Sequence, residues 1–235
     1  MAKQDRAVRT RQELIRSAAE VFGRGGFADS SVTQICSRAG VSHGALHFHF
    51  KNKQALGEAV EAAAARILLH ITGHVPLRHP APLQLLVDTS HTLAARLSCD
   101  PLLRAGFGLG SDATWRGGAL LLQQWQDWVQ LMLTVARRQG SLAADVMLDD
   151  AVHAITAVVA GLEVLGRDDA RWYSRRAVTS FWRLTLPHLA AEAVRAGTVA
   201  AGSSAVTSKD AEPAMDEAWP GDRGTGQPCD ALSGC

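Results

Sequence analysis

Three histidines crowd the stretch SVTQICSRAGVSHGALHFHF, residues 31–50, and their spacing permits two kinds of chemistry. His43 and His47 are four residues apart, so on a helix both imidazoles share one face, as in a metal site. No nearby Asp, Glu or Cys completes a ligand set, which makes metal binding the weaker hypothesis. The same face suits hydrogen bonds to DNA bases. His49, between two phenylalanines, is expected to be a half-buried packing residue.

The residues around these histidines predict a helix-turn-helix. Ser31–Gln34 reads as a capping box that opens a short helix. Gly40 permits a tight turn, and Ser42 is placed to cap a brief third helix at about 43–48. A longer helix precedes them, and we expect it to begin at a capping box over Thr10–Glu13. This motif inserts its last helix into the major groove of DNA.

We assign DNA contacts within this motif by the type of side chain. Small residues let the recognition helix approach the bases, and hydroxyl or imidazole groups can reach base edges or phosphates. Basic side chains, and the first turn of a helix, suit phosphate groups. The predicted recognition-helix contacts are Ser42, His43, Gly44, Ala45 and His47, and the predicted phosphate contacts are Thr33, Lys51 and Lys53.

The charge distribution agrees with a polyanion-binding head. The whole chain of 235 residues has a net charge of +1, but residues 1–60 hold nine Lys and Arg against five Asp and Glu. The first 60 residues therefore carry +4 and the remainder −3. A basic module on an acidic body is typical of nucleic-acid binding, although a solvated charged helix face would give the same count.

Composition predicts an all-α protein. The chain is 47% hydrophobic and 20% charged, and it is short of the β-branched and aromatic residues that dominate sheets. Further helices are expected at about 53–71, 83–98, 101–109, 119–138, 148–165 and 169–195. Residues 196–235 are rich in Ala, Gly, Ser, Asp and Pro, and we expect a disordered tail there.

The remaining sequence signals point to an intracellular setting. The four cysteines lack C-x-x-C spacing, so neither a zinc site nor a disulfide framework is predicted, and no cofactor is expected. The N-terminus has no apolar signal segment, and the longest apolar run is too short to span a membrane. We therefore expect a soluble, cytoplasmic protein without a membrane partner.

Residues 6–60 resemble the DNA-binding domain of TetR-family transcriptional repressors, through TRQELIRSAAEVFGRGGF and VTQICSRAGVSHGALHFHFKNK. Within that family the chain looks most like the γ-butyrolactone autoregulator receptors of actinobacteria, through MAKQDRAVRTRQ, HFHF, PLLRAGFGLG and QQWQDW. The family generally has Lys where His43 stands and Tyr where His47 stands. Its later R-A-G-x-R-L motif lacks the second Arg here, because Gly108 occupies that place.

The resemblance implies a head at 1–52 and a ligand-binding and dimerisation domain at 53–195. A small hydrophobic effector such as a γ-butyrolactone would bind the second domain, with Trp125 covering the lactone ring. Polar ligand partners of relatives appear here as Ala64 and Val158, so the effector could instead be an antibiotic or its precursor, as in pseudo-receptors. The residues expected to line the pocket are Trp125, Phe107, Leu103, Leu86, Met132 and Val158.

Two C-terminal helices are expected to form the interface of a homodimer. LDDAVHAITAVVAGLEVLG is apolar on nearly all sides, and WYSRRAVTSFWRLTLPHLAAEAV is amphipathic, so one side can face the monomer core and the other a partner. A two-fold dimer implies a pseudo-palindromic operator of double-stranded DNA, with half-sites roughly 34 Å apart.

Two other classes of protein remain open at this point. An enzyme could use Glu163, Asp127 or His153 of the helical body, but no nucleophile, metal set or phosphate loop accompanies them, so we predict no enzymatic activity. A ligand-independent DNA-binding dimer would use the body for dimerisation alone.

Overall fold

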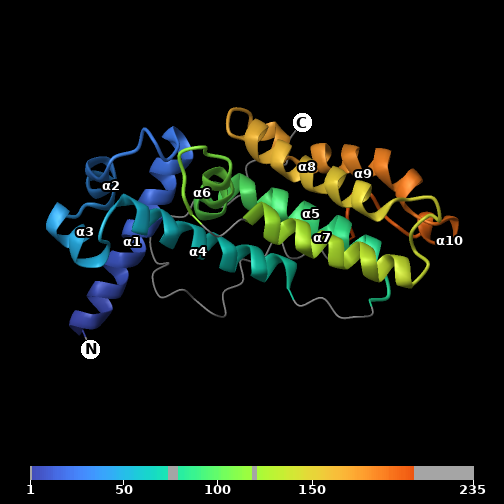
Figure 1. Cartoon of the computed structure of the whole chain (residues 1–235), viewed down its shortest axis with the longest axis horizontal. Coiled ribbons are helices and arrows are strands. Elements are labelled where there is room, and N and C mark those ends of the chain that lie inside the picture. Colours follow the sequence, from blue (N-terminus) through green and yellow to red (C-terminus); the bar gives the residue numbers. More distant parts are fainter. Residues whose placement is uncertain (1, 74–78, 118–120, 204–235) are drawn as a thin grey trace.

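The computed structural model describes residues 2–73, 79–117 and 121–203, and over these ranges the chain is all-α (Figure 1). Ten α-helices and one 3-10 helix occur there without a β-strand, as the composition predicts. Within the same ranges, none of the helices is long and apolar enough to cross a membrane. The elements are α1 (Ala2–Gly25), α2 (Val32–Ala39), α3 (His43–His49), α4 (Lys53–Thr72), α5 (Pro82–Cys99), α6 (Pro101–Gly110), α7 (Leu121–Arg138), α8 (Leu148–Gly166), η1 (Ala170–Tyr173), α9 (Arg175–Leu189) and α10 (Glu192–Arg195).

Helix α1 begins two turns earlier than the sequence predicts. Thr10 does not cap a helix, because its hydroxyl donates to the carbonyl oxygen of Arg6 at 3.0 Å from inside α1. The preceding residues contain neither Gly nor Pro, and Ala, Lys, Gln and Arg among them are good helix formers. The capping-box prediction at Thr10–Glu13 was therefore wrong, and α1 runs on towards the N-terminus.

The other predicted caps of the head are confirmed. At the start of α2 the Ser31 hydroxyl accepts from the Gln34 amide, and the Gln34 side chain accepts from the Ser31 amide. Ser42 accepts from the Ala45 amide at 3.2 Å at the start of α3. Gly40 ends α2 with φ +64°, the left-handed conformation that favours glycine. Together these caps fix the angle between α2 and α3.

Two hydrophobic cores organise the chain, and α4 belongs to both. The head core packs α1, α2 and α3 against Leu56 and Val60 from the first half of α4, and against parts of α6. The body core takes Ala64 and Leu68 from the second half of α4 and joins them to α5–α9. The predicted domain boundary after residue 52 coincides with the start of α4, but the head core continues beyond it.

Helices α4 and α6 approach unusually closely between the two cores. Gly106 of α6 lies directly against the side chain of Ala64, and an added Cβ at position 106 would overlap it. Ala64 is fully buried. The contact therefore requires the smallest residues on both helices, and it holds α6 tightly against α4.

The predicted helix over 169–195 is instead divided into three elements, η1, α9 and α10. Ser174 caps α9 by accepting from the Ala177 amide at 3.3 Å, so η1 and α9 are separate. At the other end Ala190 is extended, and Ala191 donates from its backbone to the carbonyl of Ser141 at 2.9 Å. The segment after α9 thus exchanges helical hydrogen bonds for bonds with the loop after α7.

Part of the predicted disordered tail is ordered against α5. Gln84 accepts from the Val199 amide at 2.7 Å, and Asp88 accepts from both the amide and the hydroxyl of Ser203 at 2.7 Å. The buried His91 ring lies 3.0 Å from the carbonyl oxygen of Ala200. The prediction of disorder was wrong for residues 196–203, because polar side chains of α5 satisfy their backbone groups. Residues 204–235 lie outside the described residues.

Candidate nucleic-acid interface and tryptophan core

The recognition helix α3 is held by three apolar anchors. Ile35 of α2, Leu46 of α3 and Phe50 after it are buried in the head core. These anchors turn the opposite side of α3 outward at one end of the molecule, where Figure 1 places α2 and α3 beside α1. This geometry presents the outer face of α3 to a macromolecular partner.

The predicted contact residues lie mainly on that outer face. A Cβ added at Gly44 would meet only the Ser42 hydroxyl oxygen, at 3.9 Å, so packing within the chain does not demand a glycine there. Ala45 is half-buried. The exposed members of the predicted set are Thr33, Ser42, His43, Gly44, His47 and Lys51.

Lys53, a predicted phosphate contact, is engaged in hydrogen bonds within the chain. Its ammonium group donates to the carbonyl oxygens of Phe27 at 2.7 Å, Ala28 at 3.3 Å and Ser30 at 2.9 Å. It also lies 4.4 Å from the centroid of the Phe27 ring. A lysine has three N–H donors, and all three are used within the chain. A phosphate contact by Lys53 would therefore have to replace one of these bonds.

Phe48 is a surface residue that the sequence patterns alone did not single out. Its side chain is 78% exposed on the same helix as the predicted base contacts. The signal was present, because Leu46 and Phe50 anchor the helix and a residue midway between them must point away from the core. His49 is half-buried as predicted, and burial together with the positive charge of Arg11 lowers its pKa.

The loop after α6 ties the head to α4, and no local sequence signal indicated this. Trp115 of this loop is buried, and its indole donates to the carboxylate of the buried Glu61 at 2.7 Å. Its ring lies against Gly57, where a Cβ would overlap it, and 4.7 Å from the ring of Phe27. Asp112 accepts from the Phe27 amide at 2.8 Å. This loop therefore fastens the end of α1 to α4.

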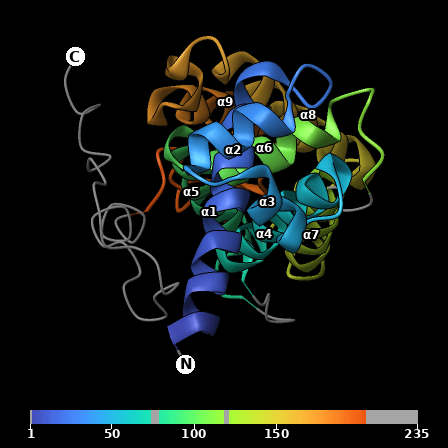
Figure 2. The same ribbon diagram turned by 90° about the vertical axis from the view of Figure 1, so that its left-hand side faces the viewer.

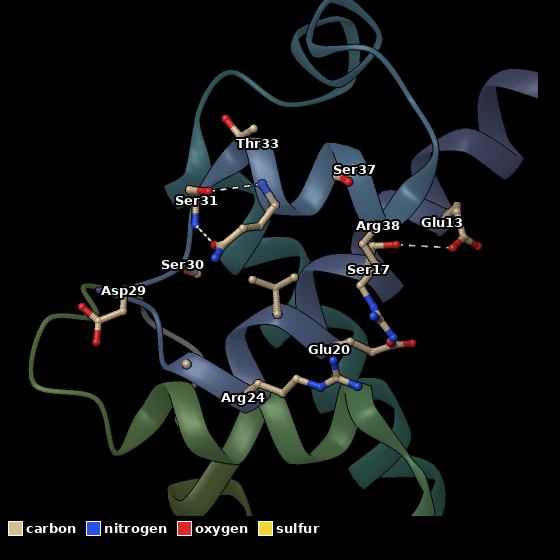
Figure 3. Close-up of a pocket in the computed structure, with 13 residues that line it drawn as sticks. Glu13, Ser17, Glu20, Arg24, Asp29, Ser30, Ser31, Thr33, Ser37 and Arg38 are labelled. Carbon is tan, nitrogen blue, oxygen red and sulfur yellow. Dashed lines mark hydrogen bonds and ion pairs between the residues drawn. The ribbon is translucent and has the colours of Figure 1, made fainter.

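A polar groove of about 970 Å³ runs between α1 and α2 on the head (Figure 3). Within the groove Arg38 forms an ion pair with Glu20, and the Ser17 hydroxyl donates to Glu13 at 3.3 Å. The groove contains none of the residues predicted to line an effector pocket. It is therefore distinct from the apolar site expected in the body.

The predicted effector residues gather in the body core. Trp125 is fully buried and stacks on Trp128, with ring centroids 5.2 Å apart and planes at 26°. Val158 is half-buried at the edge of this core. The structure thus brings together the predicted set, whose buried members are Trp125, Phe107, Leu103, Leu86 and Met132.

Several polar atoms in this part of the body are buried without a hydrogen-bond partner. They are the indole N–H groups of Trp125, Trp128 and Trp182 and the hydroxyl of Thr156. Each buried polar group without a partner costs roughly 1–3 kcal/mol. These atoms are donors on α7, α8 and α9, so they would be satisfied by hydrogen-bond acceptors.

The alternative chemistries find little support in the described residues. Among them, no three His, Cys, Asp or Glu side chains are grouped so that they could hold a metal ion. Glu163, considered for acid–base chemistry, is paired with Arg167 at 2.7 Å, and Asp127 accepts from Gln123 at 2.9 Å. Both carboxylates are thus engaged in hydrogen bonds within their own helices.

The fold and the exposed motif define a helix-turn-helix regulator with an all-helical body. Residues 14–60 match the family described as bacterial regulatory proteins, tetR family. Over 195 residues the chain is 30% identical to the A-factor receptor protein of Streptomyces griseus, covering 81% of this chain and 67% of the receptor. The chain belongs to the TetR family of bacterial regulatory proteins.

Other relatives agree with this assignment. The transcriptional regulator SrpR of Pseudomonas putida is 27% identical over 187 residues, or 76% of this chain and 86% of SrpR. The crystal structure of a gamma-butyrolactone receptor (ArpA like protein) has a TM-score of 0.72 at 25% identity, over 87% of this chain and 98% of that one. CprB from Streptomyces coelicolor, solved with its biological operator sequence, has a TM-score of 0.73 at 26% identity, over 86% and 99%. These named relatives are regulators and receptors rather than enzymes.

The hydrogen bonds of Asp112 predict a specific dependence of stability on pH. The Thr114 hydroxyl, followed by backbone amides that include Phe27, holds the pKa of Asp112 below its ordinary value of 3.8, although burial opposes this. A lowered pKa in the folded state gives stability that is present above the unfolded pKa and is lost as the pH falls through the folded one.

We therefore expect Asp112→Asn to lower the free energy of unfolding by a constant amount between about pH 5 and 7, with the difference shrinking below about pH 4. Urea unfolding at a series of pH values measures this difference. The exposed Asp145→Asn serves as a matched control. A difference that stays the same down to about pH 2.5 would contradict an ionised Asp112 as the cause.

Proposed function

We propose that this protein is a ligand-responsive transcriptional repressor that binds a pseudo-palindromic operator as a homodimer and is released by a small hydrophobic effector. The proposal rests chiefly on one observation. The recognition helix is anchored by buried apolar residues while Ser42, His43 and His47 are all exposed on its outer face. Membership of the TetR family supports the same interpretation.

Base readout is the role we propose for this outer face. Gly44 allows the backbone of α3 to approach the bases, and the Ser42 hydroxyl and the two imidazoles offer hydrogen-bonding groups. Lys51, exposed just beyond α3, is the proposed phosphate contact that orients the head.

The outer faces of α8 and α9 are the proposed dimer interface. Leu184 of α9 is 75% exposed, and Val164 and Leu165 near the end of α8 are nearly half exposed. Gly161 of α8 has open space around it, which allows a helix of a second copy to approach closely. Exposed apolar side chains on two adjacent helices are typical of an association surface.

The effector site is proposed at Trp125. Its unpartnered indole N–H, together with those of Trp128 and Trp182, offers donors in an otherwise apolar core. A small ligand with carbonyl or ether oxygens and an apolar chain would satisfy such donors, and a lactone has this chemistry. A lactone effector is also consistent with the names of two similar proteins, the gamma-butyrolactone receptor and the A-factor receptor.

One observation favours an antibiotic or its precursor as the effector. Ala64, where relatives place a polar ligand partner, is buried against Gly106. A larger polar side chain does not fit there unless α4 and α6 separate. The site therefore relies on the indole donors, and a ligand larger than a simple butyrolactone could meet more of them.

Helix α4 is the proposed route from effector to DNA. Ala64 and Leu68 pack in the effector core, while Leu56 and Val60 pack in the head. A ligand that enlarges the body core would displace α4 and so change the spacing of the two heads. Two conformations of the dimer are then in equilibrium, one that binds DNA and one that is released from it. To change their ratio from 99:1 to 1:99, the effector must bind the released conformation roughly 10⁴-fold more tightly.

The assignment of α3 is tested by two single substitutions with different expected results. His43→Ala should change the base preference, because it removes a proposed base contact. Lys51→Gln should weaken binding to all sequences and reduce the slope of log affinity against log salt by about one unit, because it removes one phosphate contact. Selection from a random duplex library followed by mobility-shift titration measures both. An unchanged preference in His43→Ala would refute its role in base readout.

Trp125→Phe tests the effector site while keeping an aromatic ring in the core. We expect the variant to bind operator DNA normally but to need about tenfold more synthetic γ-butyrolactone for release, because one proposed hydrogen bond is removed. Trp172→Phe, which alters an exposed tryptophan outside this core, is the control. If the wild type is not released by the lactone, the pseudo-receptor alternative is favoured. Equal lactone sensitivity of Trp125→Phe and the wild type would exclude the indole as a ligand partner.

Leu184→Glu tests the dimer interface. A buried charge at the interface should convert the dimer to a monomer with an unchanged helical circular dichroism spectrum, because Leu184 does not contribute to the monomer core. Light scattering after size exclusion gives the mass. Leu69→Glu, on an exposed site of α4, is the control and should remain dimeric. A dimeric Leu184→Glu would place the interface elsewhere.

A further inference from the structure

Helix α1 extends well beyond the head that it helps to build. Its first fully buried residue is Leu14, although the helix begins at Ala2. The preceding twelve residues extend for roughly 18 Å at about 1.5 Å per residue. Figures 1 and 2 show this part of α1 projecting clear of α2 and α3. We refer to residues 2–13 as the N-terminal arm.

The arm carries a concentration of positive charge. It contains Lys3, Arg6, Arg9 and Arg11 against Asp5 and Glu13. The three arginines are exposed, and in the described part of the chain none of them forms an ion pair with a carboxylate. Packing against the head core does not explain the arm, because its residues lie outside that core. Arg6 and Arg9 therefore remain available to an anionic partner.

The base of the arm lies beside the recognition helix. The Arg11 guanidinium is 5.1 Å from the ring centroid of Phe50, which ends α3. Lys51, the proposed phosphate contact, follows Phe50 directly. The arm thus starts at the edge of the proposed base-reading surface and continues outward as a preformed helix.

We propose that the N-terminal arm is a second DNA-binding element, which contacts the phosphate backbone outside the base pairs read by α3. This proposal rests on the proposed function, because α3 must first place the head on DNA. Arginine is suited to the role, since its guanidinium stays charged and can bind phosphate with two parallel hydrogen bonds. An arm of roughly 18 Å matches about five base pairs at about 3.4 Å each, so the protected site extends beyond the half-sites.

The double variant Arg6→Gln/Arg9→Gln tests this element, because glutamine preserves helix propensity and removes two charges. The probes are a duplex of about 40 base pairs that the wild type selects from a random library and a scrambled duplex of the same length. We expect the slope of log affinity against log salt to fall by about 0.9 for each phosphate contact that the substitutions remove. Affinity for both duplexes should fall about tenfold or more, while base preference is unchanged.

Shortening the selected duplex to the two half-sites separates flanking contacts from other causes. The wild type should lose affinity on the short duplex and approach the double variant, whose own affinity should change little. Arg24→Gln, an exposed arginine at the opposite end of α1, is the matched control and should behave as the wild type. Thermal unfolding verifies that both variants are folded.

Two results would overturn the arm as a DNA-binding element. The first is a salt slope and affinity of the double variant equal to those of the wild type. The second is an equal loss on long and short duplexes, which would move the contacts inside the half-sites. If the wild type selects no sequence, the proposed function fails, and the slope on the scrambled duplex still decides whether the arm contacts DNA.

Discussion

The burial of one helix in two hydrophobic cores is the constraint on which the rest of the structure depends. Leu56 and Val60 of α4 face the head, and Ala64 and Leu68, further along the same helix, face the body. Because a helix is stiff over this length, a displacement at one end is carried to the other. The close contact of Ala64 with Gly106 makes α6 part of the same rigid unit. Head and body are therefore mechanically joined even though their proposed ligands differ.

Hydrogen bonds of charged side chains reinforce the unit of α4 and α6 where apolar packing ends. Lys53 binds three carbonyl groups that follow α1, and Asp112 binds the Phe27 amide from the loop after α6. Trp115 and Glu61 connect the same loop to the middle of α4. Each bond pairs a polar group that would otherwise lie unsatisfied at a helix end or in the core. The position of α3 thus depends on contacts that lie away from its outer, proposed DNA-binding face.

Local signals in the sequence predicted much of the head, and tertiary contacts account for what they missed. Ser31 and Ser42 act as caps, as predicted, because capping depends on neighbouring residues alone. The burial of Trp115 and the internal use of Lys53 depend on segments far apart in the chain, which neither periodicity nor composition records. The apolar pattern likewise grouped Trp125 with its neighbours, but it could not indicate that the indole N–H lacks a partner.

Side chains of α5 hold the short segment that follows α10, residues 196–203. Gln84 and Asp88 are satisfied by Val199 and Ser203, and His91 lies against Ala200. A chain cut directly after α10 would leave these side chains without these bonds, one of them in the interior. A fusion partner joined after Ser203 would instead preserve every one of them. Helix α5 therefore sets the shortest chain that keeps these bonds, and that chain ends beyond α10 rather than at it.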